Sequence, residues 1–326
     1  MPSPAGQTLE RIGVNALHLR AVTGEEGDRP TCASSFAEQP LAHRPPFATL
    51  RRMSTPAAFD LDAYLARIGY DGARTPMLDT LHAITWHQAT TIPFENLDVL
   101  LSRPIVLTPE AITAKLVHAR RGGYCFEQNN LLLLALRALG FRVTPIGARV
   151  RWQLPRDATP PRTHLFLRVH LAGGDWLTDC GLGAASLTGA IPLEFGRELP
   201  TPHEPRRLTN EDGRLFHQMK VGDAWTDLCE FTLDEMHPID CEIANWWTSA
   251  NPASKFKQDV AIGLAVADGT RKAIRGGLFT HRRGAEVLHQ RTIESGAELL
   301  ALLDEHFALR FPAETRFAPP GAAWAE

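Results

Sequence analysis

One cysteine of this chain stands in a setting that favours chemistry. The segment RGGYCFEQNN, residues 121–130, places Cys125 after a pair of glycines and directly before an apolar run that predicts a helix. At a helix start the sulfur faces unpaired backbone N–H groups and the positive end of the helix dipole, which favour the thiolate over the thiol. The alternative is a core cysteine packed under a glycine turn, and the position alone leaves both interpretations open.

A thiolate nucleophile requires a base and a residue that orients the base. His164 and His170 lie in the strand-like run HLFLRVHL, and Asp179 lies inside the apolar run WLTDCGLG. An aspartate is disfavoured in a strand interior, and burying its carboxylate without a partner is costly. We therefore expect Asp179 to have a partner, and these two histidines are the candidates.

The spacing of these residues does not settle the partner. If a two-residue turn at Gly173-Gly174 joins the two strands, both histidines share a sheet face with Asp179. In that register Asp179 lies opposite Arg168, and His164 is about 13 Å away along the strand. Either a bend or bulge brings His164 and Asp179 together, or the two strands are not direct neighbours.

The elements that must position these residues follow from periodicity. Before residue 141, apolar residues recur at helical spacing in the segments 59–70, 77–90, 107–123 and 127–140. The last of these is apolar nearly all round, which predicts a buried helix directly after Cys125.

The rest of the chain is rich in strand patterns. Residues 141–235 contain short runs of Val, Leu, Ile and aromatic residues, which predict antiparallel strands in a β-barrel or sandwich. Residues 276–293 predict a β-hairpin, and residues 295–307 predict a helix with Ser295 and Glu298 at capping-box spacing.

Composition excludes several classes of function. The formal net charge is -3, from 34 basic and 37 acidic residues spread over both halves, so we expect no nucleic-acid partner. No stretch approaches the roughly 18 apolar residues of a membrane span, and the start lacks a secretory signal pattern. Five cysteines without a C-x-x-C pair indicate a reducing compartment and no metal site. We expect a soluble cytoplasmic protein with a small-molecule partner, of undetermined oligomeric state.

Several segments together resemble the arylamine N-acetyltransferase family. In that family's order they are IPFENLDVL at 92–100, RGGYCFEQNN at 121–130, the Thr-His pair at 163–164, DCGLG at 179–183 and NWWTSANPASKF at 245–256. The resemblance implies that Cys125 is the acetyl-accepting nucleophile, that His164 is its imidazole partner, and that Asp179 orients the imidazole. It also implies a structural ion pair between Glu95 and Arg121.

The family's fold agrees with the predicted elements. It implies an α+β protein with a cysteine-protease-like Cys-His-Asp arrangement: an N-terminal helical bundle over residues 54–140, a central antiparallel β-barrel over 141–245, and a linker with an α/β lid over 246–326. The first 52 residues have no counterpart in the family. Their content of Pro, Ala and charge predicts a disordered extension over residues 1–53. We hypothesise that Met53 is the native start.

The resemblance also suggests which residues meet the substrates. We expect substrate contacts from three aromatic residues near the thiol and from two residues of the DCGLG stretch: Phe94, Tyr124, Phe126, Leu182 and Gly183. Within that stretch the family usually has an apolar residue in place of Cys180, which we interpret as a buried inert thiol. Trp246-Trp247 is interpreted as core or interdomain packing.

The implied reaction is acetyl-CoA-dependent N-acetylation of an arylamine, hydrazine or arylhydroxylamine, with ping-pong kinetics through an acetyl-cysteine. Acetyl-CoA is then a donor substrate, and no cofactor is bound. Three alternatives use the same fold: an amide synthase that takes a longer acyl donor, a hydrolase with the same triad, and a binding protein that has lost the chemistry. The intact set of Cys125, His164 and Asp179 argues against the last.

Overall fold

The chain folds into a mixed α+β structure with a helical first part. The computed structural model describes residues 59–317 and residue 319, so the predictions made for residues 1–53, including the start at Met53, lie outside the described residues. The helices of the first part are α1 (Leu61–Ile68), α2 (Leu78–Thr91), α3 (Leu97–Leu100), α4 (Pro109–Ile112) with its π-helical continuation η1 (Thr113–His118), and α5 (Cys125–Ala138). All helices predicted here are present, and α3 is an additional short one.

Helix α5 forms the centre of this part. As its all-round apolar pattern predicts, residues such as Leu131, Leu132 and Leu136 are completely buried. Apolar residues of α1, α2 and η1 pack into the same core, and α5 also contacts β2 and β3 of the neighbouring sheet. Helix α5, which begins at Cys125, is therefore held on both sides by packed apolar surface, which fixes its position relative to the sheet.

An antiparallel eight-stranded sheet follows and curves into a nearly closed barrel. Its order is β5-β4-β3-β2-β9-β8-β7-β6, and its antiparallel strands agree with the prediction for this stretch. The strands are β2 (Arg142–Val150), β3 (His164–Leu171), β4 (Gly174–Thr178), β5 (Ile191–Pro192), β6 (Glu198–Leu199), β7 (Arg206–Glu211), β8 (Arg214–Val221) and β9 (Ala224–Glu235). The long strands β2 and β9 carry a register shift where they pair, which bends the sheet.

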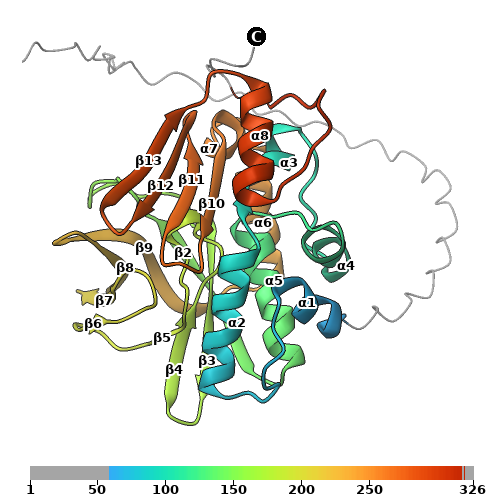
Figure 1. Cartoon of the computed structure of the whole chain (residues 1–326). Helices are drawn as coiled ribbons and strands as arrows, with labels where there is room; N and C mark the ends of the chain where they lie inside the picture. Colours follow the sequence, from blue (N-terminus) through green and yellow to red (C-terminus); the bar gives the residue numbers. More distant parts are fainter. Residues whose placement is uncertain (1–58, 318, 320–326) are drawn as a thin grey trace, which may run out of the picture. The chain divides into compact units, whose positions relative to one another are not determined.

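The last part is a five-stranded antiparallel sheet with a helix packed on it (Figure 1). The chain reaches it through α6 (Pro238–Ala250) and α7 (Lys255–Gln258). The sheet contains β1 (Phe94–Glu95), β10 (Ala261–Ala265), β11 (Arg271–Arg275), β12 (Leu278–Arg283) and β13 (Glu286–Thr292), and α8 (Gly296–Phe307) packs against it. The predicted hairpin and final helix are confirmed. The edge strand β1 comes from the helical part, so this sheet starts next to the segment that leads into Cys125.

The turn between β3 and β4 differs from the prediction. Leu171 pairs with Gly174, so the turn residues are Ala172 and Gly173 rather than Gly173-Gly174. The reason is a cross-strand ion cluster: in the observed register Asp175 lies opposite His170 and binds its Nδ1 at 2.6 Å, and it also binds Arg168. The two strands are direct neighbours, and the shift moves Asp179 two positions toward His164.

Within the described residues, no helix is long and apolar enough to cross a membrane.

One buried carboxylate joins the two sheets. Glu204, just before β7, accepts hydrogen bonds from Arg271 of β11 at 2.8 and 2.9 Å and from Arg282 of β12 at 3.1 Å. Arg206 is completely buried on the same side, with its Nη2 3.7 Å from Glu204. Removing the single anion would leave several buried cations uncompensated.

We therefore predict that Glu204→Gln lowers the free energy of unfolding at pH 7 by about 3 kcal/mol, measured by urea denaturation. The matched control is Glu198→Gln, which removes a surface ion pair with Lys220 and should cost at most about 1 kcal/mol. Equal effects of the two substitutions would contradict the prediction.

The contribution of Glu204 should also depend on pH. Burial acts to raise the pKa of Glu204, but Arg271, Arg206 and Arg282 lower it to about 2. Because the folded pKa lies below the ordinary value of about 4.3, this stabilisation is complete above that pH and is lost as the pH falls toward 2. The difference in free energy of unfolding between the wild type and Glu204→Gln, measured by urea denaturation, should therefore shrink as the pH falls over that range.

Candidate active site

Cys125 is the first residue of α5, and two glycines make this position possible. A Cβ atom on Gly122 would lie 2.2 Å from the carbonyl oxygen of Pro93, and a Cβ atom on Gly123 would lie 2.8 Å from the Glu127 side chain. Both positions therefore exclude a side chain, because the chain passes too close to its neighbours. This close approach seats the segment against β1 and determines where α5 begins.

The thiol of Cys125 is enclosed by the barrel. The residue is 4% exposed, and its Sγ donates a hydrogen bond to the carbonyl oxygen of Thr163 at 3.4 Å. Thr163 directly precedes His164. On the other side, a Cβ atom on Gly181 would lie 2.7 Å from the Cα atom of Cys125. The start of β3 and the loop after β4 therefore both lie directly against the first turn of α5.

His164 and Asp179 are hydrogen-bonded to each other. Nε2 of His164 lies 3.0 Å from Oδ2 of Asp179, and both residues are buried. The other carboxylate oxygen accepts hydrogen bonds from the side-chain amide of Asn129 and from the backbone N–H of Gly181, each at 2.7 Å. Both oxygens of this buried carboxylate thus have partners, as a buried charge requires. His170, the other candidate partner of Asp179, is bound to Asp175 instead.

Asn129 is a site residue that the sequence analysis missed. It lies four residues after Cys125, on the same face of α5, and is completely buried. Besides Asp179 it binds the carbonyl oxygen of Leu165 at 2.6 Å and the backbone N–H of Cys180 at 2.9 Å. One side chain thus ties α5 to β3 and to the loop after β4. The available sign was the polar run Glu127–Asn130 in the first turns of a helix whose later turns are mostly apolar, since buried amides must find partners.

Burial controls the charges in this site. It raises the pKa of the Cys125 thiol above its ordinary value, and the negative charge of Asp179 adds to this. The backbone N–H groups of Phe126 and Cys125 act in the opposite direction, as expected at a helix start, but they do not outweigh burial. Burial also acts to raise the pKa of Asp179, yet His164, Asn129 and Gly181 together hold it below its ordinary value. Burial and the charge of Asp179 thus oppose the thiolate form of Cys125, while the partners of Asp179 favour its ionised form.

The ion pair implied between Glu95 and Arg121 is present as part of a larger network. Arg121 donates to Glu95 from Nε at 3.1 Å and from Nη2 at 2.7 Å, and its Nη2 also lies 3.2 Å from Asp98. Asp98 in turn lies 2.7 Å from Lys115, which binds Glu127 at 2.7 Å. Alternating charges thus run from β1 to the first turn of α5.

The predicted substrate contacts fall into two groups. Tyr124 and Phe126 are completely buried in one apolar cluster with Cys125, and the Tyr124 hydroxyl binds Asn245. Phe94 and Gly183 face each other beside the nucleophile segment: Gly183 has a positive φ of 61°, and a Cβ atom there would lie 3.5 Å from the Phe94 ring. Leu182 packs against the barrel core.

Two further expectations have different outcomes. Cys180 is buried in the helical core with its Sγ 3.6 Å from the carbonyl oxygen of Thr85, in agreement with an inert thiol. The expectation that Trp246 packs in a core or between domains is wrong, because its place on the outer face of α6 leaves it 62% exposed. Among the described residues, no group of His, Cys, Asp and Glu has an arrangement that could hold a metal ion.

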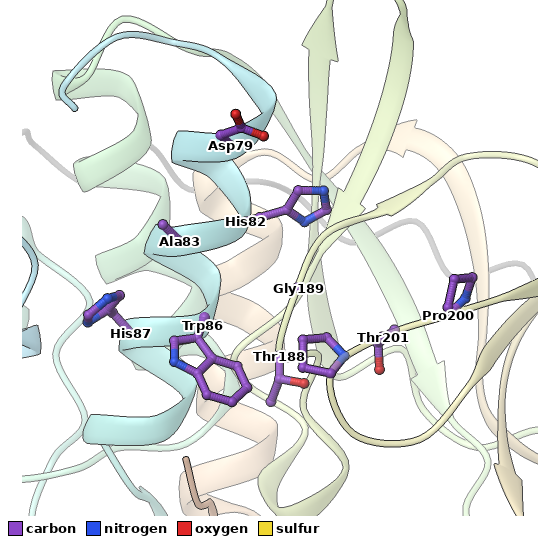
Figure 2. A pocket seen from close by; sticks show the side chains of 10 residues that line it. Asp79, His82, Ala83, Trp86, His87, Thr188, Gly189, Pro200 and Thr201 are labelled. Carbon is purple, nitrogen blue, oxygen red and sulfur yellow. The ribbon is translucent and has the colours of Figure 1, made fainter. Parts of the chain in front are cut away.

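Two cavities lie near these elements. The larger, of about 610 Å³, lies between α2 and residues 188–202 and is lined by His82, Trp86 and Thr188 among others (Figure 2). None of the predicted catalytic residues lines it. The smaller, of about 310 Å³, is lined by Thr163, Met236 and Trp247 and thus reaches the residue whose carbonyl group contacts the Cys125 thiol.

Known proteins with similar sequences share one activity in their names. The family model described as N-acetyltransferase matches residues 77–316. The chain is 40% identical over 256 residues to an arylamine N-acetyltransferase of Mycobacterium tuberculosis, covering 77% of this chain and 90% of that protein. It is 42% identical over 257 residues to the enzyme of Mycolicibacterium smegmatis, covering 77% and 92%.

Solved structures agree with this likeness. The structure of the M. tuberculosis enzyme superimposes with a TM-score of 0.73 at 40% identity, covering 76% of this chain and 93% of that one. A Mycobacterium marinum arylamine N-acetyltransferase in complex with CoA gives a TM-score of 0.73 at 36% identity, covering 76% and 92%. With both the family model and these relatives spanning most of its length, the chain belongs to the arylamine N-acetyltransferase family.

Proposed function

We propose that this protein transfers the acetyl group of acetyl-CoA to the nitrogen of an arylamine, hydrazine or arylhydroxylamine through an acetyl-Cys125 intermediate. The observation that carries the proposal is the hydrogen bond between His164 and Asp179 directly beside the start of α5, where Cys125 stands. Membership of the family supports the acyl transfer, and the CoA complex of the related M. marinum enzyme supports CoA as the carrier of the donor group.

In the first step the Cys125 thiol gives its proton to His164, and the thiolate attacks the thioester carbonyl of acetyl-CoA. The C–S bond to CoA then breaks, and the CoA thiolate takes the proton back from His164. Backbone N–H groups at the start of α5, including that of Cys125, are in place to stabilise the negative charge on the carbonyl oxygen. The products are acetyl-Cys125 and CoA, and one thioester has replaced another.

The charges of the site explain why the proton must go to His164. A lone thiolate would be a second buried anion beside Asp179, and burial together with that carboxylate raises the pKa of the thiol. Moving the proton to His164 leaves the net charge of Cys125, His164 and Asp179 unchanged, because the imidazolium compensates the thiolate. The hydrogen bond from Asp179 stabilises the imidazolium and holds its ring in one orientation.

In the second step the amine nitrogen attacks the acetyl thioester while His164 accepts a proton from the amine. The C–S bond breaks, the Cys125 sulfur takes that proton from His164, and the N-acetyl product leaves. We infer that the five-stranded sheet and α8 serve as a lid that excludes water from the acetyl-cysteine. Support for this is the close approach of β10 to residues 183–184, where a Cβ atom on Gly263 would lie 2.2 Å from the backbone nitrogen of Ala184.

We predict that incubation with acetyl-CoA alone, without an amine, adds one acetyl group to the protein, measured by intact mass. Cys125→Ser should abolish the addition, because the hydroxyl is a far weaker nucleophile. Cys180→Ser is the matched control and should still be labelled, since Cys180 faces the helical core. Labelling that persists in Cys125→Ser, or a wild type that reacts only with other acyl donors, would overturn the proposal.

A second prediction concerns the ionisation of the thiol. His164→Gln can still donate to Asp179 but cannot accept a proton, so alkylation of Cys125 by iodoacetamide at pH 7 should slow by about 10² to 10⁴-fold. The rate should then rise steadily with pH, because burial raises the pKa of the unassisted thiol. His170 lies on the same strand as His164 but is bound to Asp175 of β4, so His170→Gln serves as the control and should leave the profile unchanged. An identical pH profile for wild type and His164→Gln would remove His164 from the mechanism.

A further inference from the structure

We propose that Lys115 is a positioning residue for the acyl-transfer site: its ammonium group binds the Glu127 side chain and holds it in place, and Glu127 in turn holds the first turn of α5, where Cys125 stands. The inference rests on the proposed function only in taking Cys125 as the nucleophile.

The first observation is the contact geometry. Nζ of Lys115 lies 2.7 Å from Oε1 of Glu127 and 2.7 Å from Oδ2 of Asp98, and the three side chains are between 4% and 17% exposed. The second oxygen of Glu127 accepts the backbone N–H of Tyr124 at 3.1 Å. Tyr124 is the residue directly before Cys125, so a continuous chain of hydrogen bonds links the Lys115 ammonium to the peptide that leads into the nucleophile.

The second observation is the backbone around Lys115. It lies in η1, a π-helical turn, and such turns are rare and are frequently found at functional sites. The carbonyl oxygen of Lys115 accepts the N–H of Arg121 at 3.1 Å. Lys115 therefore binds the segment around Cys125 at two points. Its carbonyl group binds Arg121, which precedes Gly122-Gly123, and its side chain binds Glu127, which follows them.

The third observation is the charge of Glu127. Burial raises the pKa of Glu127 to about 7, with Lys115 lowering it and the nearby Glu95 raising it. The Tyr124 N–H donates to the same carboxylate, and Asp98 shares the Lys115 ammonium with it. Without Lys115, Glu127 either takes up a proton or remains an unpaired anion. A protonated Glu127 is a weaker hydrogen-bond acceptor for the Tyr124 N–H. An unpaired Glu127 anion raises the pKa of Cys125 further, since the charge of Glu127 already acts in that direction.

The test compares single and double substitutions: Lys115→Gln, Glu127→Gln and the two combined. The measurement is the pH dependence of Cys125 alkylation by iodoacetamide, which needs neither acetyl-CoA nor an amine. Its outcome is therefore separate from the choice of substrates, and thermal unfolding checks that each variant is folded. Lys220→Gln, which removes a surface lysine of β8 paired with Glu198, is the control.

We expect Lys115→Gln to slow alkylation at pH 7 by about tenfold, equivalent to a rise of one unit in the pKa of the thiol. The double variant should recover to within about threefold of the wild type, because two amides can keep the hydrogen bond to Tyr124 without a charge at position 127, while Asp98 keeps Arg121 as its partner. Lys220→Gln should match the wild type.

Two results would overturn the inference. The first is a folded Lys115→Gln variant with the wild-type alkylation profile, which would leave Lys115 a purely structural role. The second is a double variant in which the fold decrease in alkylation rate equals the product of the decreases in the two single variants. Such independent effects would mean that Lys115 and Glu127 do not act as a unit. If Lys115→Gln alone does not fold, the double variant decides. A folded double variant in which Cys125 is alkylated no faster than in Glu127→Gln would equally overturn the inference.

Discussion

The site is organised around one buried charge, the carboxylate of Asp179. No solvent reaches it, so every lone pair that faces the interior must be matched by a protein group. The groups that meet this need come from three different places in the chain: His164 at the start of β3, Asn129 on α5, and the N–H of Gly181 in the loop after β4. Satisfying one carboxylate therefore brings the helical part, strand β3 and the loop after β4 into a single arrangement.

A second set of charges fixes the helix that carries the nucleophile. The path from Glu95 through Arg121, Asp98 and Lys115 to Glu127 alternates in sign and lies mostly out of solvent. Such a network is costly to break at any one member, because the remaining charges are left without partners. Its two ends are β1, the edge of the five-stranded sheet, and the peptide before Cys125. The relation between that sheet and the nucleophile is thus set by electrostatics as well as by packing.

Much of the fold could be read from local patterns. The helices α1, α2 and α5, the hairpin of β12 and β13, and α8 are long or strongly periodic, and the structure has them where the pattern predicts. The short elements α3 and β1 carry too few residues for a period to appear. In α6 the positions of apolar residues do not indicate the buried face. Ile239, Ile243 and Trp246 are apolar yet exposed, so hydrophobicity alone does not show which face is buried.

For the site, the sequence by itself determined which side chains have the required chemistry: a cysteine at a helix start behind two glycines, a histidine at the head of a strand, and an aspartate that needed a partner. Only the tertiary structure decided how they meet. The choice of turn residues between β3 and β4 depends on the cross-strand pair of His170 and Asp175, and this register carries Asp179 toward His164. Asn129 and Lys115 acquire their roles in the same way, because buried polar groups find partners through contacts between residues far apart in the sequence, which no local pattern encodes.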